Sequence, residues 1–190
     1  MVDFTDDIEQ CLAVLKKGGL LLYPTDTVWG IGCDATNEKA VEKIYRLKKR
    51  NDEKAMIALV ADEREVLEHV ATADFRLFDH LKQVTKPTTV IYEGAIGFAT
   101  NLVAKDGSIG IRICREQFCR HLLKRFRKPI VSTSANISGS SSPAIFKQVS
   151  DEIKRGVDYI VKYRQDDETI ASPSSVIRWN KDGTITVLRS

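Results

Sequence analysis

Hydrophobic and polar positions along the chain alternate between a helical period and an extended one. Ile8, Leu12 and Leu15 recur at helical spacing, and Thr5 or Asp6 stands where a helix cap is expected. The pattern predicts this first helix before Gly18-Gly19, a second reading EKAVEKIYRLK behind a cap at Asn37, and helical stretches around residues 63–83 and 115–126.

Short apolar runs rich in β-branched residues lie between the helical stretches and predict strands. They read LLLY from residue 20, MIALV from 56, TTVIY from 88, IGIRI from 109, PIVSTS from 129, DYIV from 158, SVIRW from 175 and TITVL from 184. Turn residues at 180–183 indicate an antiparallel hairpin between the last two. The sequence therefore predicts an α/β fold whose sheet mixes parallel and antiparallel strands and is flanked by helices.

Length and composition limit the class of protein. A chain of 190 residues with 43% apolar content encloses one sizeable core, and no linker divides it, so we expect one domain over residues 1–190. Its start is acidic, and no apolar run reaches bilayer length, so we expect a cytoplasmic protein without a membrane segment. The four cysteines are too sparse for a disulfide scaffold and are expected to be thiols.

Charge is distributed unevenly along the chain. The net charge is only +3, but basic residues concentrate at 43–54 and 112–128, which favours an anionic partner. Lys48 and Arg50 lie two apart at a predicted helix end, and they converge only if the helix has ended there. Such a pair suits a phosphate or a carboxylate, although a solvated basic helix end explains it as well.

Two strand ends carry clusters of polar side chains. The strand LLLY runs into a loop containing Thr25, Asp26 and Thr27, and the strand from residue 129 ends in a segment containing Ser134 and Asn136. Residues two apart on an extended chain face the same side, so Ser134 and Asn136 present a hydroxyl and an amide together. Each cluster alone is equally consistent with an ordinary turn.

The order of the motifs is more specific than any one of them. The segments YPTDTVWGIG, KKR, GIRIC, STSANISG and SPSSVIRW follow one another along the chain. Together they resemble the YrdC-like family of threonylcarbamoyl-AMP synthases, over almost the whole sequence. The chain is similar to the short form of that family, without the extra C-terminal domain. The resemblance implies a YrdC-like fold, with a twisted sheet and a concave basic cavity.

The resemblance also implies which residues form the site. Catalysis would fall to Lys48, Arg50, Ser134 and Asn136. ATP binding would use Lys48, Arg50, Lys54, Ser108, Ser134, Ser142 and Arg189. Threonine binding would use Thr27, Arg112, Ser132 and Ser174. No residue is assigned to a metal.

The implied activity is that of a nucleotidyltransferase. Threonine's amine takes up bicarbonate, the resulting carbamate attacks the α-phosphate of ATP, and pyrophosphate is released. The product is threonylcarbamoyl-AMP, the first intermediate in the synthesis of threonylcarbamoyl-adenosine (t6A) in tRNA. The expected partners are L-threonine, bicarbonate and ATP carrying Mg²⁺, together with a separate threonylcarbamoyl transferase complex and tRNA or double-stranded RNA. Because the reactants are anionic, clustered Lys and Arg side chains would offset their repulsion.

Three alternatives compete with this interpretation. Cys114, Cys119 and His121 suggest a metal, but their spacing matches no common zinc pattern, and 119 and 121 diverge on a helix. A basic surface also suits a module that binds double-stranded RNA or tRNA without chemistry. A paralogue of the same fold without synthase activity is the third; such relatives typically lack the KxR and SxN elements.

Overall fold

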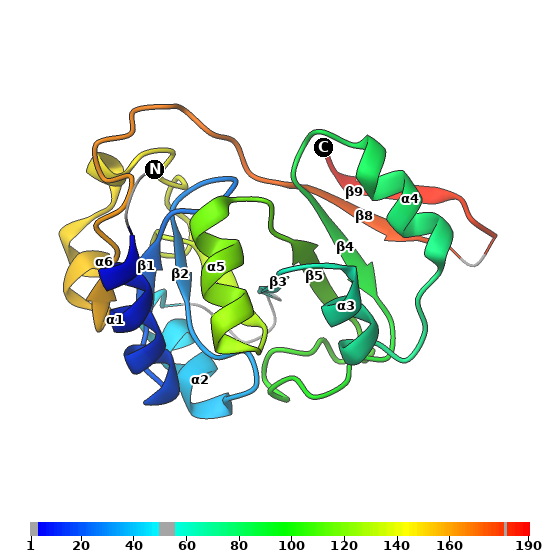
Figure 1. Cartoon of the computed structure of the whole chain (residues 1–190), viewed down its shortest axis with the longest axis horizontal. Coiled ribbons are helices and arrows are strands. Elements are labelled where there is room, and N and C mark those ends of the chain that lie inside the picture. The colour runs from blue at the N-terminus through cyan, green and yellow to red at the C-terminus, as the bar shows by residue number, and fades with distance from the viewer. Residues whose placement is uncertain (1–3, 50–55, 181) are drawn as a thin grey trace.

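The nine strands in the described part of the chain belong to one sheet. The computed structural model describes residues 4–49, 56–180 and 182–190 (Figure 1). The strands are β1 (Leu21–Tyr23), β2 (Gly30–Gly32), β3 (Ile57–Val60), β4 (Thr88–Tyr92), β5 (Ile109–Ile113), β6 (Ile130–Ser134), β7 (Tyr159–Ile160), β8 (Ser175–Trp179) and β9 (Ile185–Arg189). Their order across the sheet is β7-β1-β2-β6-β3-β5-β4-β8-β9.

Parallel and antiparallel pairs are mixed in this sheet. Strand β6 is antiparallel to both β2 and β3, whereas β3 and β5 are parallel neighbours. The last two strands, β8 and β9, form the predicted antiparallel hairpin. The mixed α/β fold expected from the sequence is therefore confirmed.

Helices cover the two faces of the sheet. They are α1 (Thr5–Lys16), α2 (Glu38–Leu47), α3 (Glu63–His69), α4 (Phe75–Gln83), α5 (Gln117–Phe126) and α6 (Asp151–Arg155), with a 3-10 turn at Phe146–Gln148. Alternate side chains divide the core: Leu59 packs with residues of α1 and α5, whereas Ala58 and Val60 pack with residues of α2, α3 and α4. In the part of the chain that the structure describes, no helix has the length and apolar content of a membrane span.

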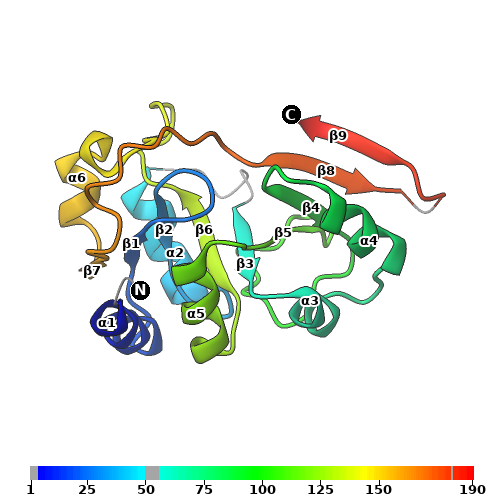
Figure 2. The ribbon, with the colours of Figure 1, turned by 45° about the horizontal axis from the view of Figure 1, so that its top comes forward.

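A long connection crosses the molecule from β7 to β8. In Figures 1 and 2 it leaves the end of the sheet that contains β1 and β7, passes over the sheet, and enters β8 on the far side. Its last residues, Pro173 and Ser174, reach the middle of the molecule beside β6 and β5. The connection thus contributes side chains to a region that the strands alone leave open.

Most predicted elements are present, and the differences are local. Asn37 caps α2 by accepting a hydrogen bond from the Ala40 amide at 3.2 Å, as predicted. The predicted cap of α1 is wrong, because Phe4 occupies the cap position and no side chain caps the helix. The predicted helical stretch at 63–83 forms two helices, each capped by an aspartate. Strand β2 was not predicted, because it contains only Gly-Ile-Gly.

The two glycines of β2 differ in the space around them. A Cβ at Gly32 meets the Val131 carbonyl oxygen at 2.7 Å, whereas a Cβ at Gly30 meets its nearest atoms at 3.4 Å, an ordinary contact. We expect Gly32→Ala to lower the free energy of unfolding by about 1–3 kcal/mol, because the backbone must move apart. The matched change Gly30→Ala should alter it by less than about 1 kcal/mol. Urea unfolding of both variants measures this, and equal losses would contradict the packing described here.

Candidate active site

A small polar cavity lies where the crossing connection meets β2, β6, β3 and β5. Its volume is about 180 Å³. The cavity is lined by Thr27, Val28, Gly30, Met56, Ile57, Arg112, Ser132, Thr133, Ser134, Ser142, Pro173, Ser174 and Arg189. All four residues implied for threonine are among them, together with three of those implied for ATP. The described part of this lining contains two arginines and no carboxylate.

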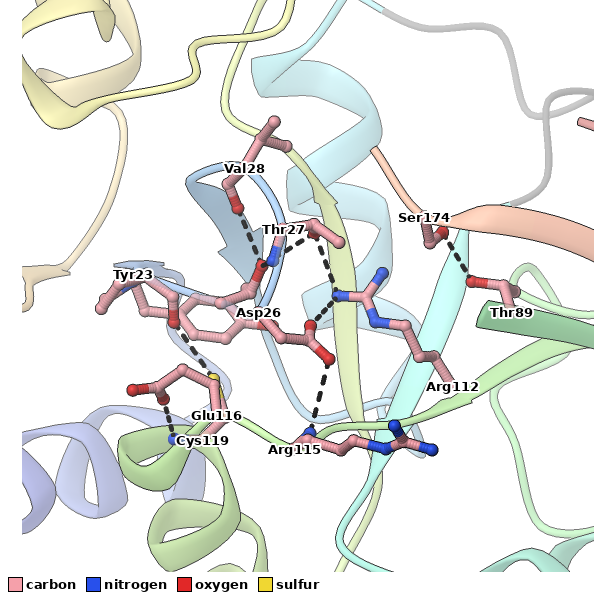
Figure 3. A network of polar contacts seen from close by, with 12 residues as sticks. Tyr23, Asp26, Thr27, Val28, Thr89, Arg112, Arg115, Glu116, Cys119 and Ser174 are labelled. Atoms are coloured by element: carbon pink, nitrogen blue, oxygen red, sulfur yellow. Dashed lines mark hydrogen bonds and ion pairs between the residues drawn. The ribbon is translucent and has the colours of Figure 1, made fainter. Parts of the chain in front are cut away.

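Arg112 is the central charged group of the cavity. It is 3% exposed, and its Nη2 lies 3.0 Å from Oδ1 of Asp26 and 3.3 Å from the Thr27 hydroxyl (Figure 3). The contact with Asp26 is an ion pair without an aligned hydrogen bond, and Nε of Arg112 is buried with no partner among the described residues. A buried donor without a partner is unusual in proteins. Because Arg112 also lines the cavity, its guanidinium is a candidate partner for an anionic ligand there.

The loop between β1 and β2 has its shape fixed by Thr25. The Thr25 hydroxyl bonds with the Thr27 hydroxyl at 2.9 Å, donates to the Val28 carbonyl oxygen at 2.9 Å, and accepts from the Thr27 amide. Asp26 also accepts a long 3.4 Å hydrogen bond from the Arg115 amide (Figure 3). Asp26 therefore contacts both Arg112 on β5 and the segment that follows β5. The loop therefore presents Thr27 to the cavity and Asp26 to Arg112.

Ser174 and Arg189 form the opposite wall. The Ser174 hydroxyl lies 2.9 Å from that of Thr89, and the Arg189 guanidinium donates to the Ser174 hydroxyl at 3.2 Å and to its carbonyl oxygen at 3.0 Å. Ser174 is buried, but Arg189 is exposed. Arg189 thus links the last strand to the cavity while its side chain remains accessible to a ligand.

The end of β6 connects Ser134 and Asn136 to Lys48. The Ser134 hydroxyl donates to Asn136 Oδ1 at 2.5 Å, and the Asn136 amide donates to the carbonyl oxygens of Ile137 and Ser140. The Lys48 ammonium donates to the carbonyl oxygens of Ser134 and Asn136. Ser134 lines the cavity, whereas Lys48 and Asn136 lie behind it and hold the loop that carries it.

Two further implied ATP residues lie outside the described part of the chain, and one lies away from the cavity. Arg50 and Lys54 fall in residues 50–55, which the structure does not describe. Helix α2 ends at Leu47, and Lys49 has a φ of 50°. The helix has therefore ended before Lys48, which is the condition set from the sequence for the KxR pair. Ser108 is not part of the lining; its hydroxyl donates to Asp106 at 2.6 Å in a turn before β5.

The residues considered for zinc have other contacts. Cys114 and Cys119 are buried, and the Cys119 thiol donates to the Pro24 carbonyl oxygen at 3.1 Å. Burial and neighbouring Cys114 raise the pKa of Cys119 well above its ordinary value. His121 is exposed, and the centroids of its ring and the Phe4 ring lie 5.4 Å apart in an edge-to-face arrangement. Among the described residues, no three His, Cys, Asp or Glu side chains form a group that could hold a metal.

Comparison with known proteins agrees with the motif order. A family model for Sua5, YciO and YrdC, described as telomere recombination, matches residues 13–190. The chain belongs to this family.

Relatives in the family cover most of the chain. A putative threonylcarbamoyl-AMP synthase of Methanocaldococcus jannaschii is 33% identical over 96% of this chain and 86% of its own length. A threonylcarbamoyl-AMP synthase of Idiomarina loihiensis is 33% identical over 85% of this chain and 87% of its own.

Solved structures show the same fold. The crystal structure of P. abyssi Sua5 complexed with L-threonine aligns with a TM-score of 0.86 at 21% identity over 100% of this chain. This chain spans only 55% of that Sua5 chain. E. coli YciO aligns with a TM-score of 0.83 at 24% identity, over 97% of this chain and 89% of its own.

Sequence reasoning missed several residues on which the site of this family member depends. Asp26, Thr25 and Thr89 contact Arg112, Thr27 and Ser174 respectively, yet none was assigned a role. For Asp26 and Thr25 a signal existed, since both belong to the PTDT segment. For Thr89 none existed, because its partner lies 85 residues away along the chain.

The pair Asp26 and Arg112 is suited to a double-mutant cycle. Asp26→Asn and Arg112→Gln should each lower the free energy of unfolding by about 3–5 kcal/mol, because each leaves one buried charge unpaired. The double variant should lose at least about 1 kcal/mol less than the sum, since no charge then remains unpaired. Urea unfolding of the four proteins gives the coupling energy, and strictly additive losses would refute a buried ion pair.

Proposed function

We propose that this protein is a threonylcarbamoyl-AMP synthase, which forms threonylcarbamoyl-AMP and pyrophosphate from L-threonine, bicarbonate and ATP. The observation that carries the proposal is Arg112, a buried guanidinium that lines a small cavity of hydroxyl groups and whose Nε has no partner among the described residues. Relatives that are 33% identical over most of the chain have this activity in their names. Residues 1–190 act as one domain in this proposal.

The cavity suits an amino acid better than a whole nucleotide. Its volume of about 180 Å³ is below the range of ~300–1,000 Å³ typical of sites for drug-sized ligands. Arg112 is placed to pair with the carboxylate of threonine, and the hydroxyls of Thr27, Ser132 and Ser174 supply partners for its polar groups. These four residues form the threonine half of the proposed site.

ATP then occupies the open side of the cavity. Ser134, Ser142 and Arg189 line that side, and Arg189 is exposed enough to meet a phosphate. The sequence adds Arg50 and Lys54 to this nucleotide half, and Lys48 and Asn136 hold Ser134 in position from behind. Ser108 remains assigned to the nucleotide by the resemblance alone. Magnesium enters with the phosphates of ATP, and no side chain of this chain is assigned to it.

The reaction in this proposal depends on position and charge. Threonine held by its carboxylate directs its amine toward bicarbonate, and an N–C bond forms as water leaves. The carbamate oxygen then attacks the α-phosphate of ATP, and pyrophosphate leaves. Arg50 and Arg189 offset the negative charge that these groups bring together. The product passes to a separate transferase for the t6A modification of tRNA, in the cytoplasm.

Product formation tests the proposal directly. Incubation of the protein with ATP, labelled threonine and bicarbonate should give labelled threonylcarbamoyl-AMP and one pyrophosphate per product. Ser134→Ala should lower kcat/KM by roughly ten- to a hundred-fold, the cost of one contact to a charged group, while Ser141→Ala, an exposed position outside the lining of the cavity, should not. An absence of product even with an active transferase present would leave RNA binding, or a paralogue without chemistry, as the function.

Amino-acid selectivity gives a second prediction. Serine lacks one methyl of threonine, which discriminates by only ~1–3 kcal/mol, whereas valine lacks the hydroxyl and leaves a buried polar partner unpaired. We expect serine to be the main wrong substrate and valine to be rejected by orders of magnitude. Pyrophosphate release with each amino acid measures the ratios of kcat/KM. Equal turnover of valine and threonine would refute a hydroxyl-reading pocket around Thr27.

A further inference from the structure

A second and larger cavity of about 470 Å³ has no role in the proposed synthase reaction. It lies beyond the carboxyl ends of the parallel strands β3 and β5, where Ala61 and Cys114 follow the last strand residues. After β3 the chain continues into α3, and after β5 it continues into α5; Figures 1 and 2 show these helices on either side of the two strands. A crevice at such a divergence is the usual place for a ligand in an α/β sheet.

The floor of this cavity is apolar. Ile111, Cys114 and Tyr92 are buried there, and Ile113 and Leu81 are partly buried beside them. The volume falls within the range of ~300–1,000 Å³ that small-molecule sites occupy. An apolar floor of this size favours a ligand with an apolar body.

The carboxylates around this floor already have partners. Asp26 pairs with Arg112 at 3.0 Å, and Glu63 pairs with Lys82 at 3.4 Å. Asp62 accepts hydrogen bonds from two amides at the start of α3, at 3.1 Å and 3.2 Å. Acidic groups on the rim are therefore committed to the protein itself.

The cations on the rim outnumber the carboxylates by five to three. Arg115 donates to the Val84 carbonyl oxygen at 2.7 Å and so holds the loop before β4. Lys86, in that loop, and Arg120, on α5, are exposed and form no ion pair with any residue that the structure describes. These two side chains leave positive charge at the mouth of an apolar cavity.

We infer that this cavity is a second ligand site, which binds a small amphipathic anion with its apolar body on Ile111, Ile113 and Tyr92 and its charged group at Lys86 and Arg120. Charge complementarity selects an anion over a cation of the same shape. The site is distinct from the threonine cavity, because Ile111 and Ile113 point to the face of β5 opposite to Arg112. Asp26 connects the two, because it lines this cavity and pairs with Arg112, which lines the other.

Binding of the fluorescent anion anilinonaphthalene sulfonate to the full chain tests this site without reference to synthase activity. The wild-type protein should bind it saturably at one site. The double variant Lys86→Glu/Arg120→Glu should bind at least about tenfold more weakly, because two attractive charges become repulsive. The matched control Lys39→Glu/Lys124→Glu makes the same change in net charge at exposed positions outside the cavity and should bind within about twofold of wild type.

Competition on the wild-type protein supplies a second measurement that needs no variant. Octanoate should displace the probe, and octylammonium, with the same chain and the opposite charge, should not. Both double variants should unfold cooperatively at the wild-type temperature, which excludes probe binding to a loosened core. Equal weakening in the two double variants, equal displacement by the two competitors, or the absence of saturable binding would each overturn the site.

Discussion

The burial of Arg112 is the constraint on which the arrangement of the site depends. A guanidinium does not lose its proton in a protein, so its burial requires a fixed carboxylate or an anionic ligand. Asp26 meets that requirement from the loop between β1 and β2, across the two strands, β6 and β3, that separate β2 from β5 in the sheet. Thr25 fixes the shape of this loop. This ion pair thus connects the loop between β1 and β2 to strand β5, beside the cavity.

Strand β6 supplies the second connection. It is antiparallel to β2 on one side and to β3 on the other, and its hydroxyl residues line the same cavity as Thr27 and Arg112. Lys48 is 1% exposed, and its ammonium is bonded to carbonyl oxygens beyond the end of β6. A lysine buried at this depth costs stability unless its donors are used, so the end of α2 and the Ser134 loop are held together. Lys48 of the KxR motif is therefore joined directly to the SxN motif, although 86 residues separate Lys48 from Ser134.

The sequence predicts most of this fold because its strands are apolar runs with clear turn signals, and the hairpin at 180–183 is an example. Strand β2 was missed because two of its three residues are glycines, which are depleted in strands, and its conformation depends on pairing with β1 and β6. The set of site residues came from motif order, which brought seven of them to one cavity. Periodicity alone does not reveal that Asp26 pairs with Arg112 or that Thr89 contacts Ser174, because both contacts depend on strand order in three dimensions.

The two halves of the cavity differ in how far they are organised before a ligand arrives. On the side proposed for threonine, Arg112, Ser132 and Ser174 are buried, and Thr27 is held by Thr25, so little side-chain freedom remains to be lost on binding. On the side proposed for the nucleotide, Arg189 is exposed and Ser142 lies in a loop, so the entropy lost when these side chains become ordered would have to be offset by their contacts with phosphate. In the proposed reaction, a rigid threonine half would fix the position of the reacting amine, where small displacements reduce the rate most. The burial of Arg112 therefore does more than stabilise the sheet, because it sets the reference point from which the geometry of the proposed reaction follows.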